Sequence, residues 1–402
     1  MTPRRVLAVL AASELCGMAP WFSASAVAPA LSRVWQLDSA GGAWLTISVQ
    51  LGFVAGALVS ALLTLSDRWS ARRLVAACAC LAGLLTVGVA FAPGSGTGIA
   101  LRILTGAALA GVYPPGMKIV AGWYREGRGL AIGVLVGALT LGSALPHLVR
   151  WAVPVEHWRP VLIIAAAAAF VGGLLVLLVP HDGPFAAPAP PFSWRAAPRI
   201  LANRAVSLAN LGYLGHMWEL YAMWTWLAAF VAASELARTG GAAAGSRTPA
   251  LVTFAVVGSG ALGCWLGGKY GDRWGRTLIT SVAMTLSGAC ALAAGFAFGH
   301  PLALLVPLLL VWGITVVADS AQFSACVTEL GDPRYIGTAL TMQTCVGFLI
   351  TTASIRMMPS LVARVGWRYA FSALAIGPVL GIIAMLRLRG TPEALKIAQG
   401  RR

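Results

Sequence analysis

Long apolar runs recur along the whole chain, separated by short breaks that are rich in Gly, Pro or Arg. Each run has about 20 residues, the length that crosses roughly 30 Å of hydrocarbon as an α-helix. Continuous runs, as opposed to ten-residue alternation, favour an all-α membrane protein over a β-barrel. The pattern predicts twelve transmembrane helices, over residues 5–31, 41–65, 74–92, 98–121, 129–149, 159–179, 205–232, 248–270, 278–298, 301–327, 336–358 and 366–388.

Composition and charge support a bilayer as the solvent. Of the 402 residues, 58% are hydrophobic and 10% are charged, whereas about a quarter of the residues in soluble proteins are charged. A net charge of +16 suggests nucleic-acid binding in a soluble protein, but no polar module is left here for nucleic acid. Lys and Arg gather instead in alternate loops, which predicts that both termini and the central loop are cytoplasmic and lie against anionic lipid headgroups. We expect the protein in the inner membrane of a bacterium.

Two short motifs each occur twice at the same spacing. ELCGMAPW begins at Glu14 and ELYAMWTW at Glu219, while DRW begins at Asp67 and again at Asp272, so both pairs are 205 positions apart. A common offset in a helix and in a loop indicates a tandem repeat in parallel orientation. The predicted organisation is a six-helix bundle over 1–180, an extended Pro-rich cytoplasmic linker over 181–204, a second six-helix bundle over 205–390 and a basic cytoplasmic tail over 391–402.

The two DRW loops resemble the signature of the major facilitator superfamily, roughly G-x-L-x-D-R-x-G-R-R. The second copy matches through Gly267, Gly268, Asp272, Arg273, Gly275 and Arg276, and the first matches in part through Asp67, Arg68, Arg72 and Arg73. The resemblance covers essentially the whole chain and implies a secondary transporter with two six-helix halves around a central site. It also implies that Asp67, Arg68, Arg72, Arg73, Asp272, Arg273 and Arg276 form a conformational latch. The alternative is that these charges only set the topology.

Carboxylates inside the predicted helices are costly unless they are functional. Glu14 lies nine residues beyond Arg5, or roughly 13 Å along a helix, near the midplane. Glu219 is its repeat equivalent, so the two are expected on opposite walls of one cavity. Met18 and Trp21 share a helix face with Glu14, as Met223 and Trp226 do with Glu219; the alternative is that these side chains only pack between helices.

The fourth and tenth predicted helices carry further candidates. Arg102 and Gly106 resemble the family's R-x-x-x-G pattern, which implies a role in proton coupling and a pair with Glu14. Pro114, Pro115 and Gly116 predict a break in the helix, and Asp319 falls at the equivalent depth of the other half. Lys118 either binds substrate or reaches the cytoplasmic interface, and His216 either hydrogen-bonds Glu219 or packs as a neutral side chain.

These residues form two predicted groups. The candidates for proton coupling are Glu14, Glu219 and Asp319. The candidates for substrate binding are Met18, Trp21, Arg102, Tyr113, Lys118, His216, Met223, Trp226 and Gln322.

The sequence has no phosphate-binding GxxxxGK[ST] loop and no His and Cys cluster with metal-ligand spacing, so we expect no enzyme activity, no metal and no cofactor. The hypothesis is alternating-access transport of a small organic solute, coupled to protons, by a monomer. Organic-anion symport is favoured, because Arg102 and Lys118 offer counter-charge and WYREGRGLAIG resembles family members that handle organic acids. The alternatives are a proton-driven exporter of amphipathic or cationic compounds and a membrane sensor or scaffold.

Overall fold

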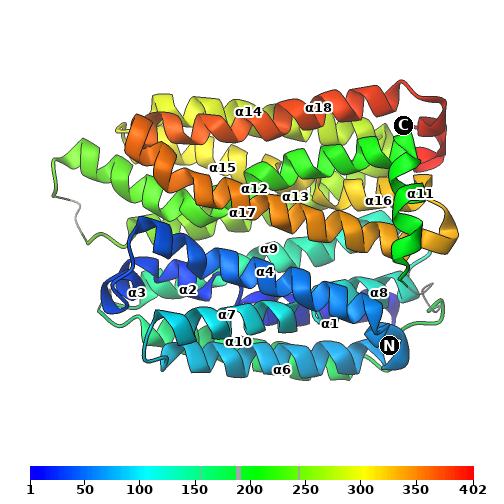
Figure 1. Ribbon diagram of the computed structural model, residues 1–402, viewed down its shortest axis with the longest axis horizontal. Helices are drawn as coiled ribbons and strands as arrows, with labels where there is room; N and C mark the ends of the chain where they lie inside the picture. The colour runs from blue at the N-terminus through cyan, green and yellow to red at the C-terminus, as the bar shows by residue number, and fades with distance from the viewer. Residues whose placement is uncertain (155, 187–191, 243–244) are drawn as a thin grey trace.

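The computed structural model describes residues 1–154, 156–186, 192–242 and 245–402, and it is an elongated bundle of helices. Both chain termini lie at one end of the bundle (Figure 1). We call this the termini end and the other the distal end. The prolines of the predicted linker at 188, 190 and 191 lie outside the described residues.

The helices of the first part of the chain fill one half of the bundle in Figure 1. They are α1 (Pro3–Met18), α2 (Ser23–Ala26), α3 (Ala28–Val34), α4 (Ser39–Leu62), α5 (Leu65–Arg68), α6 (Ala71–Ala90), α7 (Ser95–Leu109), α8 (Tyr113–Trp123), α9 (Arg128–Ala152), α10 (Arg159–Leu175) and the 3₁₀-helix η1 (Val176–Leu178).

The later helices fill the other half. They are η2 (Trp194–Ala196), α11 (Ala197–Ala202), α12 (Arg204–Thr239), α13 (Thr248–Trp274), α14 (Arg276–Ala297), α15 (Leu302–Ala318), α16 (Ser320–Leu330), η3 (Pro333–Tyr335), α17 (Ile336–Ala370), η4 (Phe371–Ala375), α18 (Ile376–Arg389) and η5 (Pro392–Gly400). The sequence predicts an extended linker over 181–204. The structure differs, because η2 and α11 lie within this range.

Three of the predicted spans are interrupted in the structure. The first is broken after Met18, where Pro20 has no N–H to continue the helix. The fourth is broken between α7 and α8, and the tandem prolines stand in the first turn of α8, where a missing N–H costs nothing. The tenth is interrupted at Asp319, between α15 and α16. Breaks of this kind free backbone groups within the membrane, and these need partners.

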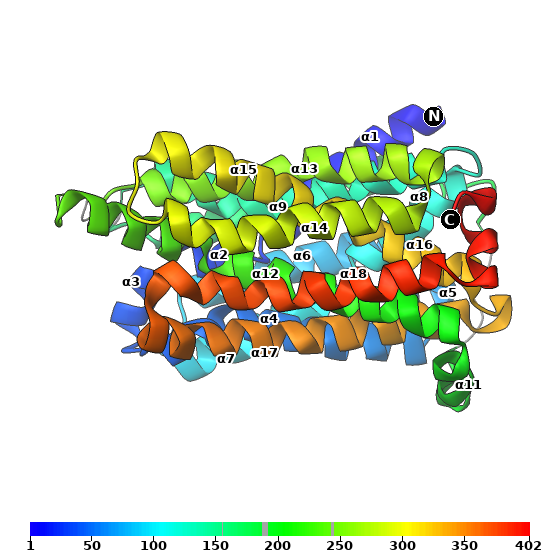
Figure 2. The same ribbon diagram turned by 90° about the horizontal axis from the view of Figure 1, so that it is seen from above.

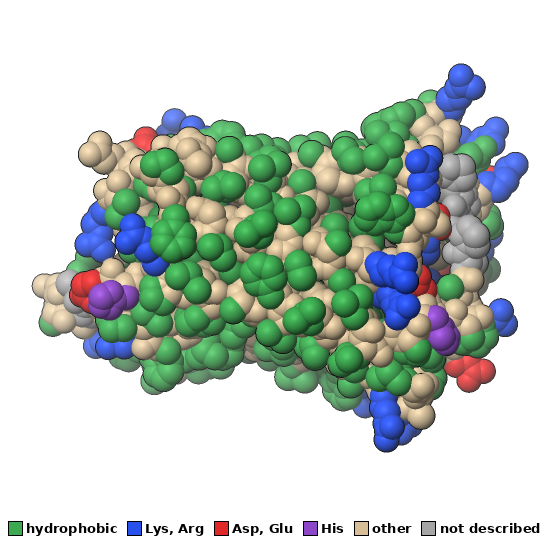
Figure 3. Space-filling model, turned by 90° about the horizontal axis from the view of Figure 1, so that it is seen from below, with side chains coloured by type: hydrophobic (Ala, Val, Ile, Leu, Met, Phe, Trp, Pro, Cys, Tyr) green, Lys and Arg blue, Asp and Glu red, His purple; other side chains and the backbone are tan. Residues whose placement is uncertain are grey.

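Ten helical segments within the described residues are long and apolar enough to cross a membrane. The segment Pro333–Arg389 alone spans 57 residues and holds two of the predicted helices, which part at Gly366 with a φ of 71°. The first predicted span does not qualify because α1 has only 16 residues. Figure 3 shows the resulting surface, hydrophobic along the middle with Lys and Arg towards the two ends.

Each half contains a pair of helices that approach closely at a glycine, and the two glycines occupy equivalent positions. A Cβ added at Gly106 of α7 would lie 1.9 Å from the carbonyl oxygen of Val49 in α4, and one at Gly313 of α15 would lie 2.0 Å from that of Val256 in α13. Gly106 and Gly313 are 207 positions apart, as are Val49 and Val256. The sequence repeat therefore has a counterpart in three dimensions, although the exact bounds of the two halves stay a prediction.

We predict that Gly106→Ala destabilises the protein, because the added methyl group cannot fit against the Val49 carbonyl. Forcing such a group into a packed contact costs roughly 1–3 kcal/mol. The measurement is the thermal unfolding midpoint of the purified protein in detergent.

Gly96→Ala is the matched control, because Gly96 also lies in α7 but has nothing within 4 Å of its would-be Cβ. Equal midpoints for the two variants would contradict the close approach of α4 and α7.

Candidate functional site

Glu14 places a buried carboxyl group beside the break in the fourth span. Its side chain is 2% exposed, and Oε2 lies 3.1 Å from where a Cβ of Gly116 would stand. The Tyr113 hydroxyl is within electrostatic range of the same carboxyl. Oε1 has no hydrogen-bond partner among the described residues. Glu14 therefore faces the start of α8 without a counter-charge in hydrogen-bond contact.

The other half contributes a buried pair of titratable side chains. His216 Nδ1 of α12 lies 2.9 Å from Asp319 Oδ1, and both residues are 1% exposed. The Tyr213 ring stands 6.0 Å from that of His216, and Tyr113 and Tyr213 are electrostatic neighbours. We call Glu14, Tyr113, Tyr213, His216 and Asp319 the central polar group. Its residues come from both halves. Tyr113 begins α8 after the break in the fourth span, and Asp319 is the residue at the break in the tenth.

The repeat predicted that Glu219 faces Glu14 across a cavity, and the structure differs. Its Oε2 accepts a hydrogen bond of 2.8 Å from the Ser287 hydroxyl, and its Oε1 accepts one of 2.7 Å from the Trp312 indole N–H. Both donors belong to the same half as Glu219, and they satisfy both carboxyl oxygens. The predicted bond between His216 and Glu219 is also absent from the structure, because His216 pairs with Asp319 instead.

Arg102 supports the break in the first span. Its guanidinium is fully buried and donates to the carbonyl oxygens of Pro20 at 2.7 Å, of Leu45 at 3.3 Å and of Trp21. The Trp21 carbonyl follows the end of α1 and has no backbone donor among the described residues, and a buried carbonyl needs one. The Pro20 carbonyl also accepts from the Ser23 N–H at 3.3 Å and from the Ser23 hydroxyl at 2.8 Å. The structure thus brings Arg102 to the backbone that follows α1 and not to the Glu14 carboxyl group.

The first predicted latch lies at the termini end and includes Lys118. The Lys118 ammonium donates to Asp67 Oδ1 at 2.5 Å and to the Ser66 carbonyl at 2.6 Å. Arg72 donates to the Val179 carbonyl at 2.8 Å, while Arg68 and Arg73 are exposed. Lys118, predicted as a possible substrate ligand, reaches the latch in this structure.

The second predicted latch is a larger network around Arg276. This guanidinium pairs with both carboxyl oxygens of Glu329, at 3.0 and 2.9 Å, with Asp272 at 3.0 Å, and with the Gln322 side-chain oxygen at 2.7 Å. Gln322 is therefore held at the latch, and Arg273 is exposed. A Cβ added at Gly129 would lie 2.7 Å from Asp272 Oδ2, so this latch also touches the start of α9 in the other half.

The C-terminal segment folds over this second latch. The Ala398 N–H donates to Glu329 Oε2 at 3.1 Å, and the Arg401 guanidinium donates to the Asp272 carbonyl at 2.6 Å. Ala394 and Ile397 are buried. Residues 391–402, predicted as a basic tail, are therefore a packed part of the structure.

A cluster of aromatic rings joins the two halves on the distal side of Glu14. Trp21 lies 5.8 Å from Tyr221 and 5.5 Å from Phe348, and Phe53 lies 4.7 Å from Phe348, as ring centroids. Phe22 and Trp224 complete the set, at 5.9 Å from each other. We call these six rings the aromatic cluster.

The other predicted wall residues belong to the same hydrophobic core as this cluster. Met18 and Met223 are buried in the core, and the Trp226 indole donates to the Ile355 carbonyl at 3.1 Å. Sequence reasoning missed Tyr213, although it lies three residues before His216 on the same helix face. It also missed Phe22, Phe53, Tyr221 and Phe348, because nothing local separates a Phe at an interface from one that faces lipid.

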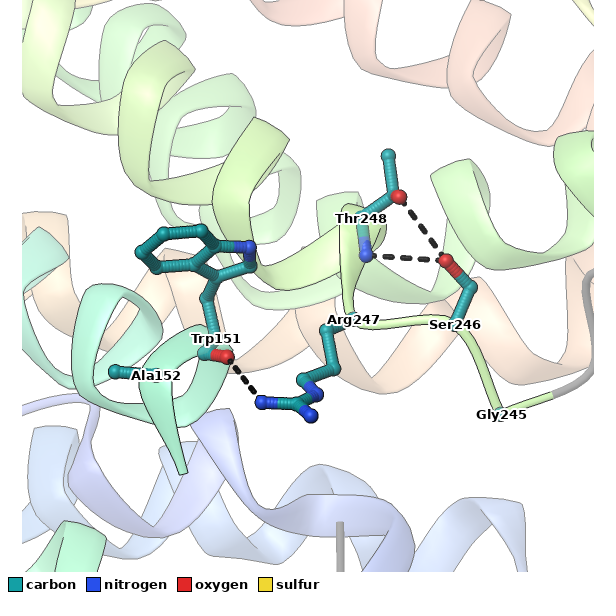
Figure 4. Close-up of a pocket in the computed structure, with 6 residues that line it drawn as sticks. All are labelled: Trp151, Ala152, Gly245, Ser246, Arg247 and Thr248. Carbon is teal, nitrogen blue, oxygen red and sulfur yellow. Dashed lines mark hydrogen bonds between the residues drawn. The ribbon is translucent and has the colours of Figure 1, made fainter. Parts of the chain in front are cut away.

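A shallow recess at the distal end also bridges the halves. Trp151 and Ala152 at the end of α9 line it together with residues 245–248 before and at the start of α13 (Figure 4). Arg247 donates to the Trp151 carbonyl at 3.4 Å. The recess draws on none of the central polar group, so it adds a contact between the halves at this end.

The two helical halves meet at buried titratable side chains, and they also touch at the second latch near the termini end and at the recess near the distal end. This arrangement is typical of a secondary transporter. The chain belongs to the Major Facilitator Superfamily, whose family model matches residues 10–355. This is a family of transporters and not of enzymes, and the protein is an integral membrane protein.

Among curated proteins, the chain is 29% identical over 136 residues to the 3-(3-hydroxy-phenyl)propionate transporter of Escherichia coli strain K12. That match covers 34% of this chain and 32% of the relative, so it spans about a third of either protein.

Solved structures share the fold over the full length. The human organic anion transporter MFSD10 (TETRAN) superposes with a TM-score of 0.69 at 17% identity, over 96% of this chain and 100% of its own. The proton:xylose symporter XylE gives a TM-score of 0.72 at 15% identity, over 96% and 95%. The nucleoside transporter NupG gives 0.70 at 17% identity, over 96% and 100%.

We predict that Glu219→Gln destabilises the fold and that Glu14→Gln does not. A glutamine at 219 offers only one acceptor oxygen to the Ser287 and Trp312 donors, and a lost buried hydrogen bond costs roughly 1–3 kcal/mol. A glutamine at 14 removes a buried acidic group that has one unpartnered oxygen. Thermal unfolding midpoints in detergent test this order, and the reverse order would contradict it.

A further prediction concerns the C-terminal segment. Glu329→Gln weakens the contacts to Arg276 and to the Ala398 N–H. Because loss of one hydrogen bond to a charged group makes the segment open more often, the trypsin cleavage rate at Lys396 should rise roughly tenfold. Glu393→Gln is the control, because Glu393 lies exposed in the same segment. Equal cleavage of the two variants would show that Glu329 does not hold the segment.

Proposed function

We propose that this secondary transporter carries a small organic acid with an aromatic ring, together with protons, by alternating access of its two halves. Both termini would face the cytoplasm of a bacterium, because the basic loops gather at the termini end, and the functional unit would be a monomer. Substrate would bind at the central polar group.

The observation that carries this proposal is the His216 and Asp319 pair. Asp319 Oδ1 lies 2.9 Å from Nδ1, an approach that lacks hydrogen-bond geometry in this state, and the buried Nε2 has no hydrogen-bond partner among the described residues. A histidine oriented by a carboxylate through one ring nitrogen can donate from the other, especially when it is protonated. Nε2 is therefore the group we assign to the carboxylate of the substrate, and the Tyr213 ring lies 6.0 Å from the His216 ring.

Relatives support the same class of substrate. The curated relative carries 3-(3-hydroxy-phenyl)propionate by its name, and one structural neighbour is named an organic anion transporter. The aromatic cluster is in keeping with a substrate ring, since it offers ring faces and edges between the halves.

Glu14 and Asp319 are the proton carriers in this proposal. An ionised carboxylate at membrane depth costs several kcal/mol unless it is paired or faces water. Glu14 has no counter-charge in hydrogen-bond contact, so its protonation is favoured when the halves close around its carboxyl group, and release is favoured when they open to water. This difference between states couples proton movement to the rocking of the halves.

Export of an amphipathic cation in exchange for protons is the second candidate. Arg102 donates to carbonyl groups, and Lys118 pairs with Asp67. The central polar group therefore has two carboxyl groups and, among the described residues, no arginine or lysine. This charge favours a cationic substrate. Aromatic rings attract cations as well as other rings.

We predict that proteoliposomes accumulate labelled 3-(3-hydroxyphenyl)propionate when the external pH is lower than the internal pH. Asp319→Asn and Glu14→Gln should lose this proton-driven accumulation by about tenfold or more but keep exchange of labelled for unlabelled substrate, because exchange needs no net proton transfer. His216→Gln should lose both, because it removes the group that holds the carboxylate.

Glu126→Gln is the control, since Glu126 is exposed in the loop before α9. Uptake of tetraphenylphosphonium driven by a pH gradient of the opposite sign, with no transport of the acid, would overturn symport and favour the exporter.

A further inference from the structure

An apolar groove runs along the outside of the bundle where the two halves meet. It lies between α1, α9 and α13, which Figure 2 shows on the same side of the molecule. Its lining includes Ala12 and Leu15 of α1, Ala138 and Leu141 of α9, and Ala261 and Trp265 of α13. At its floor, a Cβ on Gly137 would stand 3.2 Å from the Ala261 carbonyl, so any occupant touches both halves at their junction.

The position of the groove along the bundle fits one leaflet of a bilayer. Ala261 lies near the middle of α13, and Lys269 lies eight residues closer to the termini end. Eight residues of helix span about 12 Å, and half of the hydrocarbon thickness is roughly 15 Å. The groove therefore extends from the bilayer centre towards the headgroups of the leaflet at the termini end.

A lysine with an unpaired charge marks the headgroup end of the groove. Lys269 Nζ lies 4.8 Å from the ring centroid of Trp265, a lining residue, and 5.4 Å from that of Tyr270. The ion pairs of the described residues do not include Lys269, and the nearest acid along its helix, Asp272, pairs with Arg276. An ammonium group at this depth complements a phosphate.

We propose that this groove binds an anionic phospholipid, with one acyl chain between α1, α9 and α13 and the phosphate at Lys269. The apolar lining accepts the chain of any lipid, and Lys269 adds the preference for a net negative headgroup. Because the chain contacts α1 and α9 of one half and α13 of the other, the bound lipid responds to the relative position of the halves. This site is separate from the central polar group and does not depend on the transported solute.

Native mass spectrometry of the detergent-purified protein tests the proposal with dioleoyl phosphatidylglycerol, dioleoyl phosphatidylcholine and glycerol 3-phosphate. We expect phosphatidylglycerol to bind about fivefold more tightly than phosphatidylcholine, the contribution of one cation near a headgroup. Glycerol 3-phosphate, which has the phosphate but no chains, should not bind. Equal affinities for the two lipids, or binding of glycerol 3-phosphate, would overturn the proposal.

Variants locate the lipid on the protein. Lys269→Gln should abolish the preference for phosphatidylglycerol and leave phosphatidylcholine binding unchanged, whereas Lys396→Gln, which removes an exposed charge at the same end, should keep the preference. Ala12→Phe, at an exposed lining position, should weaken binding of both lipids severalfold by filling the groove. Retention of the preference in Lys269→Gln, or wild-type binding by Ala12→Phe, would place the lipid elsewhere.

Discussion

The requirement that every backbone polar group within a bilayer has a partner governs this structure. The first span breaks after Met18, which leaves the Trp21 carbonyl without a backbone donor among the described residues, while the Pro20 carbonyl also accepts from Ser23. Arg102 donates to both of them and to the Leu45 carbonyl. One buried guanidinium therefore ties α1 and its break to α4 and α7. This anchorage holds Glu14 near α8 and Trp21 against the rings of the other half.

The two halves are joined both by a close backbone approach and by side-chain contacts. A Cβ added at Gly133 of α9 would lie 2.7 Å from the Cys264 carbonyl of α13, and one at Gly268 of α13 would lie 2.9 Å from the Gly129 carbonyl of α9. Inside each half, α4 with α7 and α13 with α15 approach so closely at glycines that no side chain fits between them. Between the halves, many contacts are made by side chains, such as the aromatic cluster, the bond from Thr351 to Gln50 of 2.6 Å, and the approach of Asp272 to α9. Ring and polar contacts can separate without breaking a helix, and this is what rocking of rigid halves requires.

Much of the fold could be predicted from the sequence, because bilayer thickness fixes the length of a helix and the charged loops mark its ends. The break before Pro114 was also predictable, since proline cannot continue a helix from its interior. The partners of buried polar side chains could not be predicted. Glu14 and Glu219 are each followed by Leu, Met and Trp at the same spacing, yet Glu219 meets Ser287 and Trp312, which are 68 and 93 residues away. Arg102 likewise meets the carbonyls of Pro20 and Leu45, which are 82 and 57 residues away.

Proton exchange on substrate binding tests the central claim most directly. The purified protein in weakly buffered detergent solution would receive 3-(3-hydroxyphenyl)propionate adjusted to the same pH, and a pH indicator would follow the change. Symport through Glu14 and Asp319 predicts that the wild type takes up protons as the acid binds and that the double variant Glu14→Gln with Asp319→Asn binds without uptake. Binding without proton uptake by the wild type, or the same uptake by the double variant, would contradict the account.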